Sequence, residues 1–318
     1  MMKRSLVKMV ALATGIAVMA AVAGCGDGAK QQYLNIGTGG TAGTYYPLGG
    51  AIAEIINKNI PGANASTEST GASVANINML KDHAIDLAFV QNDIAYYAAN
   101  GIEMFDGKKV DSIRGIATLY PETIQLVTLE KNGIRTIADL RGKRVAVGAP
   151  GSGAEANARQ ILQAAGLSYD DIDVQYLSFG EASGALKDGN VDAAFVTAGF
   201  PTAAVQDVSA TQPITLVGLD DATADALVAQ YPYYTKTVIP AGTYDGVTSD
   251  IATVSVMAMI VATDKMTDAQ GYDITKAIFN NLDRIAAAHA VGKLITKDGA
   301  MKGMPLTMNA GAEKALKE

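Results

Sequence analysis

Hydrophobic and polar residues follow two periods along the chain, and these predict strands alternating with helices. A short apolar stretch at 33–36 predicts a buried strand, followed by a glycine-rich loop and a helical pattern at 45–59. The alternation continues with expected strands at 65–70 and 86–90 and expected helices at 72–81 and 93–99. Strand alternating with helix is typical of a parallel α/β sheet.

The same order of elements repeats further along the chain. Expected strands lie at 144–147, 174–177 and 192–196, and expected helices at 154–165 and 181–188. The third strands of the two units, IDLAFVQ at 85–91 and VDAAFVT at 191–197, share Asp, Ala, Phe and Val at equivalent positions. Convergent α/β packing could produce part of this likeness. Two similar units nevertheless favour two lobes that face each other across a cleft.

Two long apolar segments lie outside the repeated units. The segments 116–129 and 253–263 are long enough to cross from one lobe to the other as extended strands, which would form a hinge. Residues from 268 onward show a mostly helical pattern, and we place them on the first lobe. The expected lobes are therefore 33–123 with 256–318, and 124–255.

The N-terminal residues predict export and a lipid anchor. Lys3, Arg4 and Lys8 precede an apolar run at 10–22, which is too short to span a bilayer and suits a signal-peptide core. The run ends in VAGC, so we expect residues 1–24 to be a lipoprotein signal peptide and Cys25 to be lipidated. Residues 25–32 would form a polar tether. The alternative is an ordinary signal peptide followed by a chance cysteine.

Composition and charge exclude several functions. Cys25 is the only cysteine, which rules out a disulfide, a thiolate metal site and a cysteine nucleophile in the rest of the chain. The net charge is −7, and removing three signal-peptide cations takes it to −10, so nucleic acid is a poor partner. Hydrolase and metalloprotease motifs are missing. We expect no cofactor, and capture of a small solute rather than its conversion.

Two glycine-rich loops are the first candidate binding elements. GTGGTAGT at 37–44 and GAPGSG at 148–153 each join a strand to a helix, where backbone N–H groups and a positive helix end can hold an anion. The glycine spacing matches neither a dinucleotide-binding fingerprint nor a P-loop. The alternative for each loop is a tight turn that binds no ligand. No Lys or Arg occurs between Gln31 and Asn57. A carboxylate held by N–H groups and by hydroxyls of the first loop fits this pattern.

Polar residues at the ends of equivalent strands are further candidates. Gln91 and Thr197 occupy matching places, and ligands of open α/β sheets bind outside the carboxyl ends of strands. Either residue could instead bond its own backbone at a helix start. Ser73 and Ser152 begin expected helices, and Ser152 can cap its helix. Tyr120 could line the cleft or pack at the hinge.

Several segments, in order along the chain, resemble TAXI-type solute receptors, the binding proteins of one branch of TRAP transporters. The most distinctive are IGTGGTAGTYYPLGG at 36–50, IATLYPETIQLV at 116–127, IADLRGKRVAVGAPGSG at 137–153 and GMPLTMNAGAEK at 303–314. The resemblance covers nearly the whole chain after the expected signal peptide. Ala154 is one departure, since family members often have threonine there.

The resemblance implies an α/β type II periplasmic-binding-protein fold, with two lobes joined by two crossing strands around a cleft. It implies a TRAP permease, driven by an ion gradient, as the membrane partner, and a small carboxylate such as glutamate or 2-oxoglutarate as the ligand. An enzyme or a signalling receptor on the same fold is the alternative. The ligand-contact positions that it implies are Gly39, Gly40, Thr41, Tyr45, Ser73, Gln91, Tyr120, Ser152, Gly153, Thr197 and Gly199.

Overall fold

The computed structural model describes residues 31–318. The expected signal peptide, the lipidation site at Cys25 and most of the expected tether lie outside the described residues. Gln32, the last residue expected in the tether, already belongs to the first strand. Within residues 31–318, no helix has the length and apolar character needed to cross a bilayer.

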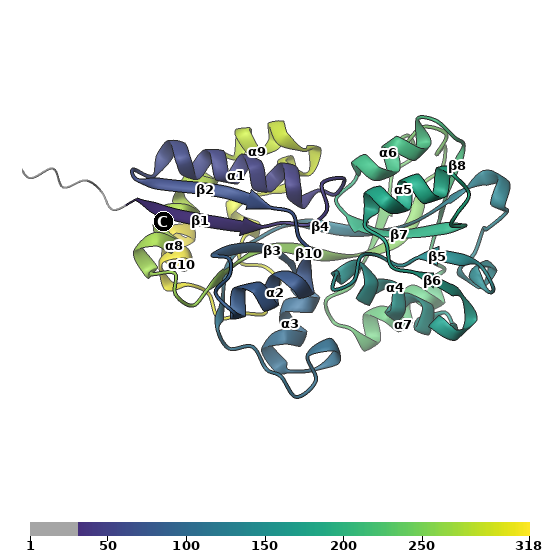
Figure 1. The fold of residues 1–318 in the computed structure, drawn as a ribbon, viewed down its shortest axis with the longest axis horizontal. Coiled ribbons are helices and arrows are strands. Elements are labelled where there is room, and N and C mark those ends of the chain that lie inside the picture. Colours follow the sequence, from purple (N-terminus) through teal and green to yellow (C-terminus); the bar gives the residue numbers. More distant parts are fainter. Residues whose placement is uncertain (1–30) are drawn as a thin grey trace, which may run out of the picture. The chain divides into compact units, whose positions relative to one another are not determined.

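The first repeated unit forms three parallel strands with helices between them (Figure 1). Strand β1 pairs with β2 on one side and with β3 on the other. Its elements are β1 (Gln32–Gly37), α1 (Tyr45–Asn59), β2 (Ala63–Glu68), α2 (Ser73–Lys81), β3 (Leu87–Gln91) and α3 (Asn92–Asn100). Each was expected from the sequence to within about two residues, because apolar periodicity and glycine or proline breaks mark the ends.

The second repeated unit has the same strand order. Strand β5 pairs in parallel with β6 and β7, as β1 does with β2 and β3. Its elements are β5 (Arg144–Ala146), α4 (Gly153–Ala164), β6 (Asp173–Gln175), α5 (Phe179–Lys187) and β7 (Ala193–Ala198). The repeat inferred from the two third strands is therefore confirmed.

Two long strands join the two units. Strands β4 (Ile113–Leu129) and β10 (Ile251–Thr263) are antiparallel and run between the two groups of elements in Figure 1. β10 pairs with β3 of the first unit, and β4 pairs with β7 of the second. The path through the sheet is β2-β1-β3-β10-β4-β7-β5-β6, with β8 and β9 attached to β4 and β10. The expected crossing strands are confirmed.

The remaining elements complete the two ends of the molecule. The segment after β7, which the sequence pattern left unassigned, holds α6 (Ala203–Ser209), β8 (Ile214–Val217), α7 (Asp221–Gln230) and β9 (Thr235–Ile239). The C-terminal helices are α8 (Asp268–Phe279), α9 (Leu282–Ala288) and α10 (Ala310–Lys317). They lie beside α1 and β1, as expected (Figure 1). Residues 32–318 form one compact unit, and the lobe boundaries at 123/124 and 255/256 stay a prediction.

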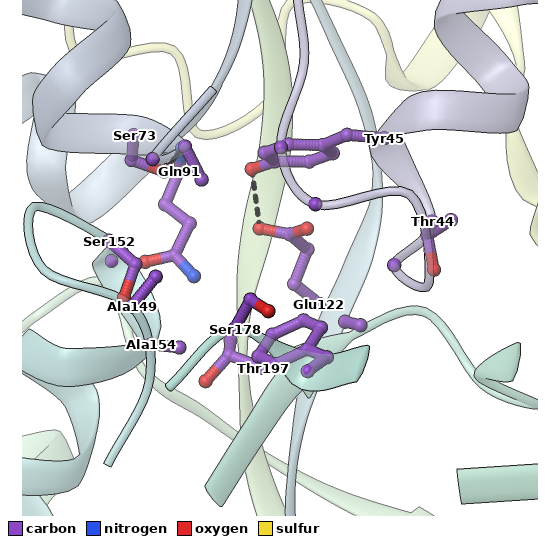
Figure 2. Close-up of a pocket in the computed structure, with 18 of the residues that line it drawn as sticks. Thr44, Tyr45, Ser73, Gln91, Glu122, Ala149, Ser152, Ala154, Ser178 and Thr197 are labelled. Carbon is purple, nitrogen blue, oxygen red and sulfur yellow. Dashed lines mark hydrogen bonds between the residues drawn. The ribbon is translucent and has the colours of Figure 1, made fainter. Parts of the chain in front are cut away.

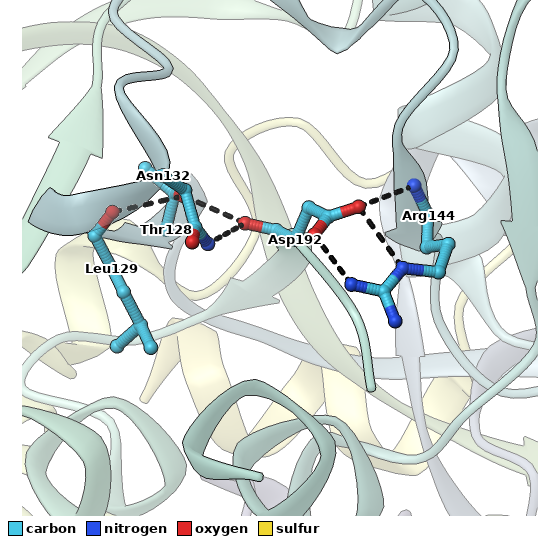
Figure 3. A network of polar contacts seen from close by, with 5 residues as sticks. All are labelled: Thr128, Leu129, Asn132, Arg144 and Asp192. Carbon is cyan, nitrogen blue, oxygen red and sulfur yellow. Dashed lines mark hydrogen bonds and ion pairs between the residues drawn. The ribbon is translucent and has the colours of Figure 1, made fainter. Parts of the chain in front are cut away.

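Matching aspartates directly precede the third strand of each unit. The Asp86 carboxylate accepts the backbone N–H of Asn35 at 2.8 Å, and the Asp192 carboxylate accepts that of Arg144 at 2.9 Å. Asp192 also accepts two bonds from the Arg144 guanidinium, at 3.1 and 2.7 Å, as Figure 3 shows. Its carbonyl accepts bonds from Thr128 and Asn132. The shared Asp thus holds the first and third strands of its unit in register.

A buried polar network connects α3 to α4. The Asn157 side-chain amide donates to the Asp93 carboxylate at 2.9 Å and to the Tyr234 hydroxyl at 2.7 Å. The Tyr234 hydroxyl donates to Gln160, which donates to the hydroxyl of Tyr97. Burial raises the pKa of Asp93 to about 6, against the bonds from Asn157 and the backbone, which lower it. The two units are therefore joined by specific polar contacts as well as by apolar packing.

Candidate functional site

A cavity lies where the two units meet, with an empty volume of about 560 Å³ that includes its open mouth (Figure 2). Its lining comes from both glycine loops, from the ends of β3 and β7, and from the middle of β4. The lining residues with polar side chains are Thr44, Tyr45, Thr70, Ser73, Gln91, Glu122, Ser152, Ser178 and Thr197.

Four helix N-termini converge on this cavity. The first residue and the N-cap residue of α1, α2, α4 and α5 all line it, so each repeated unit contributes two helix ends. The helix dipole and the N–H groups of the first turn make each end favourable for negative charge. Within residues 31–318, none of the cavity-lining residues is Lys or Arg. The positive potential in the cavity therefore comes from the backbone.

The second unit caps its helix ends with serine side chains, whereas the first unit does not. Ser152 accepts the N–H of Glu155 at 3.1 Å, and Ser178 accepts that of Glu181 at 3.4 Å. The predicted capping role of Ser152 is confirmed. Neither α1 nor α2 has a side-chain cap. The N-terminal residues of α1 thus lie at the cavity without a side-chain oxygen in front of them.

Hydrogen bonds close the two units around the cavity. The hydroxyl of Thr44 donates to the carbonyl of Gly199 at 3.1 Å. The N–H groups of Val74 and Ala75, in the first turn of α2, both donate at 3.1 Å to the carbonyl of Gly151 in the opposite loop. Each glycine loop therefore contacts the other unit, and the structure is a closed form.

Glu122 is the one acidic side chain among the described residues that line the cavity. It projects from β4 between Tyr45 on one side and Ser178 and Thr197 on the other (Figure 2). The Tyr45 hydroxyl donates to Glu122 Oε2 at 2.8 Å. Burial raises the pKa of Glu122 to about 8, although the bond from Tyr45 lowers it, and Asp93 nearby raises it further. Burial also raises the pKa of Tyr45, so the neutral forms of both side chains predominate at pH 7.

Two buried side-chain oxygens in the lining have no hydrogen-bond partner in the described part of the chain. They are Oε1 of Gln91 and Oγ1 of Thr197, at equivalent positions of β3 and β7. Buried polar atoms are normally paired, because an unpaired one costs about 1–3 kcal/mol. A ligand with a hydrogen-bond donor would supply the partner of Gln91 Oε1, whereas the Thr197 hydroxyl can itself donate to an anion.

The structure brings most of the expected contact residues together. Eight of the expected positions line the cavity: Gly39, Gly40, Tyr45, Ser73, Gln91, Ser152, Gly153 and Thr197. Thr41, Tyr120 and Gly199 do not. The Thr41 side chain is exposed outside the cavity, and Tyr120 is fully buried in β4, packed against Gly199. The Gly199 carbonyl is turned to the hydroxyls of Thr44 and Thr202.

Sequence reasoning missed Glu122 and Ser178. Glu122 is an isolated acid inside the apolar segment 116–129, and a charge in a strand that is otherwise buried is a usable signal. Ser178 starts the helix of the second unit that matches α2, and it belongs to a capping box with Glu181. Comparison of the second helix of each repeated unit would have indicated Ser178, because it lies at the start of that helix, as Ser73 does in the first unit.

Residues 36–318 match the model of the NMT1-like family. The chain belongs to this family. A segment of this NMT1-like protein is 35% identical over 79 residues to a protein from Escherichia coli (strain K12) named for the binding of aliphatic sulfonates. The match spans only about a quarter of each chain, 25% of this one and 24% of the relative.

Solved structures of periplasmic binding proteins share the fold of the NMT1-like protein. An alkanesulfonate-binding protein from Xanthomonas axonopodis pv. citri, bound to MOPS, aligns with a TM-score of 0.51 at 20% identity, over 91% of this chain and 84% of that one. A protein from Prochlorococcus marinus (MIT 9301) in complex with methylphosphonate aligns with a TM-score of 0.53 at 12% identity, over 84% and 89%. The expected fold class, α/β with the periplasmic-binding-protein architecture, is confirmed.

Proposed function

We propose that this chain is the extracytoplasmic solute receptor of a TAXI-type TRAP transporter. It captures a small carboxylate in the cavity and delivers it to an ion-gradient-driven permease. The convergence of four helix N-termini on one cavity without Lys or Arg is the observation that supports an anionic ligand most directly. The segments that resemble TAXI-type receptors support the transporter class.

The names of the similar proteins suggest a second candidate ligand class. A relative is named for aliphatic sulfonates, and two structural neighbours are described with MOPS and with methylphosphonate. A sulfonate or a phosphonate would also be held by helix N-termini. The size of the anionic head group and the number of its oxygens distinguish these classes from a carboxylate.

A thermal-shift screen of the purified chain tests the ligand class. The panel contains 2-oxoglutarate, succinate, L-glutamate, ethanesulfonate, methylphosphonate and ATP. A ligand present at 100 times its Kd stabilises the folded state by about 2.7 kcal/mol, which raises the melting temperature by several degrees. We expect a carboxylate to give the largest shift. Stabilisation by ATP alone would contradict a receptor for small anions, and conversion of a ligand during incubation would favour an enzyme.

The lipid anchor belongs to the same proposal and has its own test. Cys25 would be lipidated, which would keep the receptor near the bilayer and raise its local concentration at the permease. Cells that express the chain with a labelled fatty acid should label the wild type but not Cys25→Ser. Equal labelling of both proteins would contradict the anchor.

A further inference from the structure

Glu122 is the feature of the cavity that a simple anion receptor does not explain. Its side chain lines the cavity that four helix N-termini surround, and the residue is 2% exposed. The Tyr45 hydroxyl occupies Oε2 at 2.8 Å, which leaves Oε1 to interact with a bound solute. A charged carboxylate at this position would repel the anion that the helix ends attract.

Burial is the main factor that disfavours the charged form of Glu122. The titratable side chains that act on it are Tyr45 from α1, Tyr120 from β4 itself and Asp93 from α3. None of the three is a cation, and within residues 31–318 no cation lines the cavity. Burial, with a smaller contribution from Asp93, raises the pKa of Glu122 to about 8, although hydrogen bonding with Tyr45, Gln91 and Tyr120 lowers it. The carboxyl is therefore mostly protonated at pH 7.

We propose that Glu122 binds the solute anion as a neutral carboxylic acid, so that the anion and one proton occupy the cavity together. The inference rests on the proposed receptor function and adds a proton to its ligand. The only bond change is the proton transfer: water or buffer gives up a proton, an O–H bond forms on the Glu122 carboxylate, and this O–H donates a hydrogen bond to an anionic oxygen of the solute. The Thr197 hydroxyl, which has no partner in the described structure, and the side-chain Nε2 group of Gln91 flank the same space and can act as further donors.

The proposal fixes the pH dependence of binding. Only the protonated receptor binds the anion well, so the competent fraction falls once the pH exceeds the pKa of Glu122. The apparent Kd should be constant below pH 7 and about tenfold higher at pH 9 than at pH 7. A ligand whose ammonium group faced Glu122 would show the opposite behaviour, because it would favour the charged carboxylate and release a proton.

Isothermal titration of the full chain with 2-oxoglutarate tests this inference. Heats measured at pH 8.5 in two buffers of different ionisation enthalpy give the number of protons exchanged. We expect uptake of most of one proton for the wild type. Glu122→Gln, a neutral side chain of the same shape that still has a donor, should bind with no uptake and with a Kd that does not change between pH 7 and 9. Glu313→Gln, a partly exposed residue of α10 outside the cavity lining, is the control and should behave like the wild type.

Three results separate the inference from the proposed function. Binding with proton release, or with no proton exchange, would overturn the role of Glu122 and leave the receptor function intact. Absence of any binding heat would count against the carboxylate class itself. In that case the carboxyl titration of Glu122, assigned by ¹³C NMR from the difference between wild type and Glu122→Gln, decides the inference. A midpoint near 8 supports it, and a midpoint at or below 5 overturns it.

Discussion

Gln91 of the first unit occupies the space that a side chain on Gly153 of the second unit would need. A Cβ atom placed on Gly153 would lie 2.0 Å from Oε1 of Gln91, far inside van der Waals contact. Gly153 is the first residue of α4, and Gln91 is the last residue of β3. The two residues meet at the cavity wall, so the closed form depends on a glycine at this helix start.

Gly153→Ala should weaken binding more than it weakens the fold. The added methyl group displaces the Gln91 side chain into the cavity, and we expect the Kd to rise at least about tenfold. Gly184→Ala on α5 is the matched control, since its Cβ meets nothing within 4 Å, and it should bind normally. Titration calorimetry on both variants measures the difference. Equal affinities would show that Gln91 can move aside without cost.

Gln91→Ala should reduce affinity without unfolding the protein. The side-chain Nε2 group of Gln91 is a hydrogen-bond donor at the cavity, and the backbone N–H that donates to Ser73 Oγ at 3.1 Å is retained. Loss of one hydrogen bond to a charged ligand should cost about 1.5–3 kcal/mol of binding, and the melting temperature without ligand should change little. An unchanged Kd would remove Gln91 from the binding site.

Asp93→Asn should remove a pH dependence of stability that the wild type shows. The pKa of Asp93 is raised to about 6 in the folded protein, above its value in an unfolded chain. Its contribution to the free energy of unfolding is therefore fully present at low pH, where the carboxyl is protonated, and is lost as the pH rises through 6. Relative to Asp93→Asn, the wild type should lose about 3 kcal/mol between pH 3.5 and pH 7. Urea unfolding at both pH values tests this, with the exposed Asp283→Asn on α9 as the control. Parallel pH profiles of wild type and Asp93→Asn would contradict the assignment.

The two matching aspartates should differ in their contribution to stability. Asp192 accepts one backbone and two guanidinium hydrogen bonds, whereas Asp86 accepts one backbone bond. Because Arg144 is partly exposed, its ion pair with Asp192 is weakened by solvent. Asp192→Asn should lower the free energy of unfolding by about 1–3 kcal/mol, and Asp86→Asn by about 1 kcal/mol or less. Denaturant midpoints of the two variants provide the comparison. A larger loss for Asp86→Asn would show that the register is held mainly in the first unit.

The repeat could be recognised from the sequence because its strands obey local rules. Asp86 and Asp192 precede runs of apolar residues that are buried on both faces, and the glycine loops mark the strand ends. Helix α1 was expected with its observed bounds, because Pro61 and Gly62 end its apolar pattern. These signals depend on near neighbours in the chain.

Features that depend on contacts between distant segments could not be predicted. Tyr120 and Glu122 project from one strand, yet Tyr120 is enclosed beneath Gly199 and Glu122 lines the cavity. Which side chain reaches the cavity depends on how β4 packs against elements about 80 residues away in the sequence. The segment from α6 to β9 has short strands and a weak hydrophobic periodicity. Its strands are therefore determined by their pairing with β4 and β10, which the local sequence does not reveal.

A crystal structure of the protein with 2-oxoglutarate would show directly whether the cavity binds a carboxylate. We expect the anion inside the cavity, with its carboxylate oxygens accepting hydrogen bonds from backbone N–H groups at the helix starts and one oxygen within hydrogen-bond distance of Glu122. Binding outside the cavity, or binding of the carboxylates through Lys or Arg side chains, would contradict this expectation.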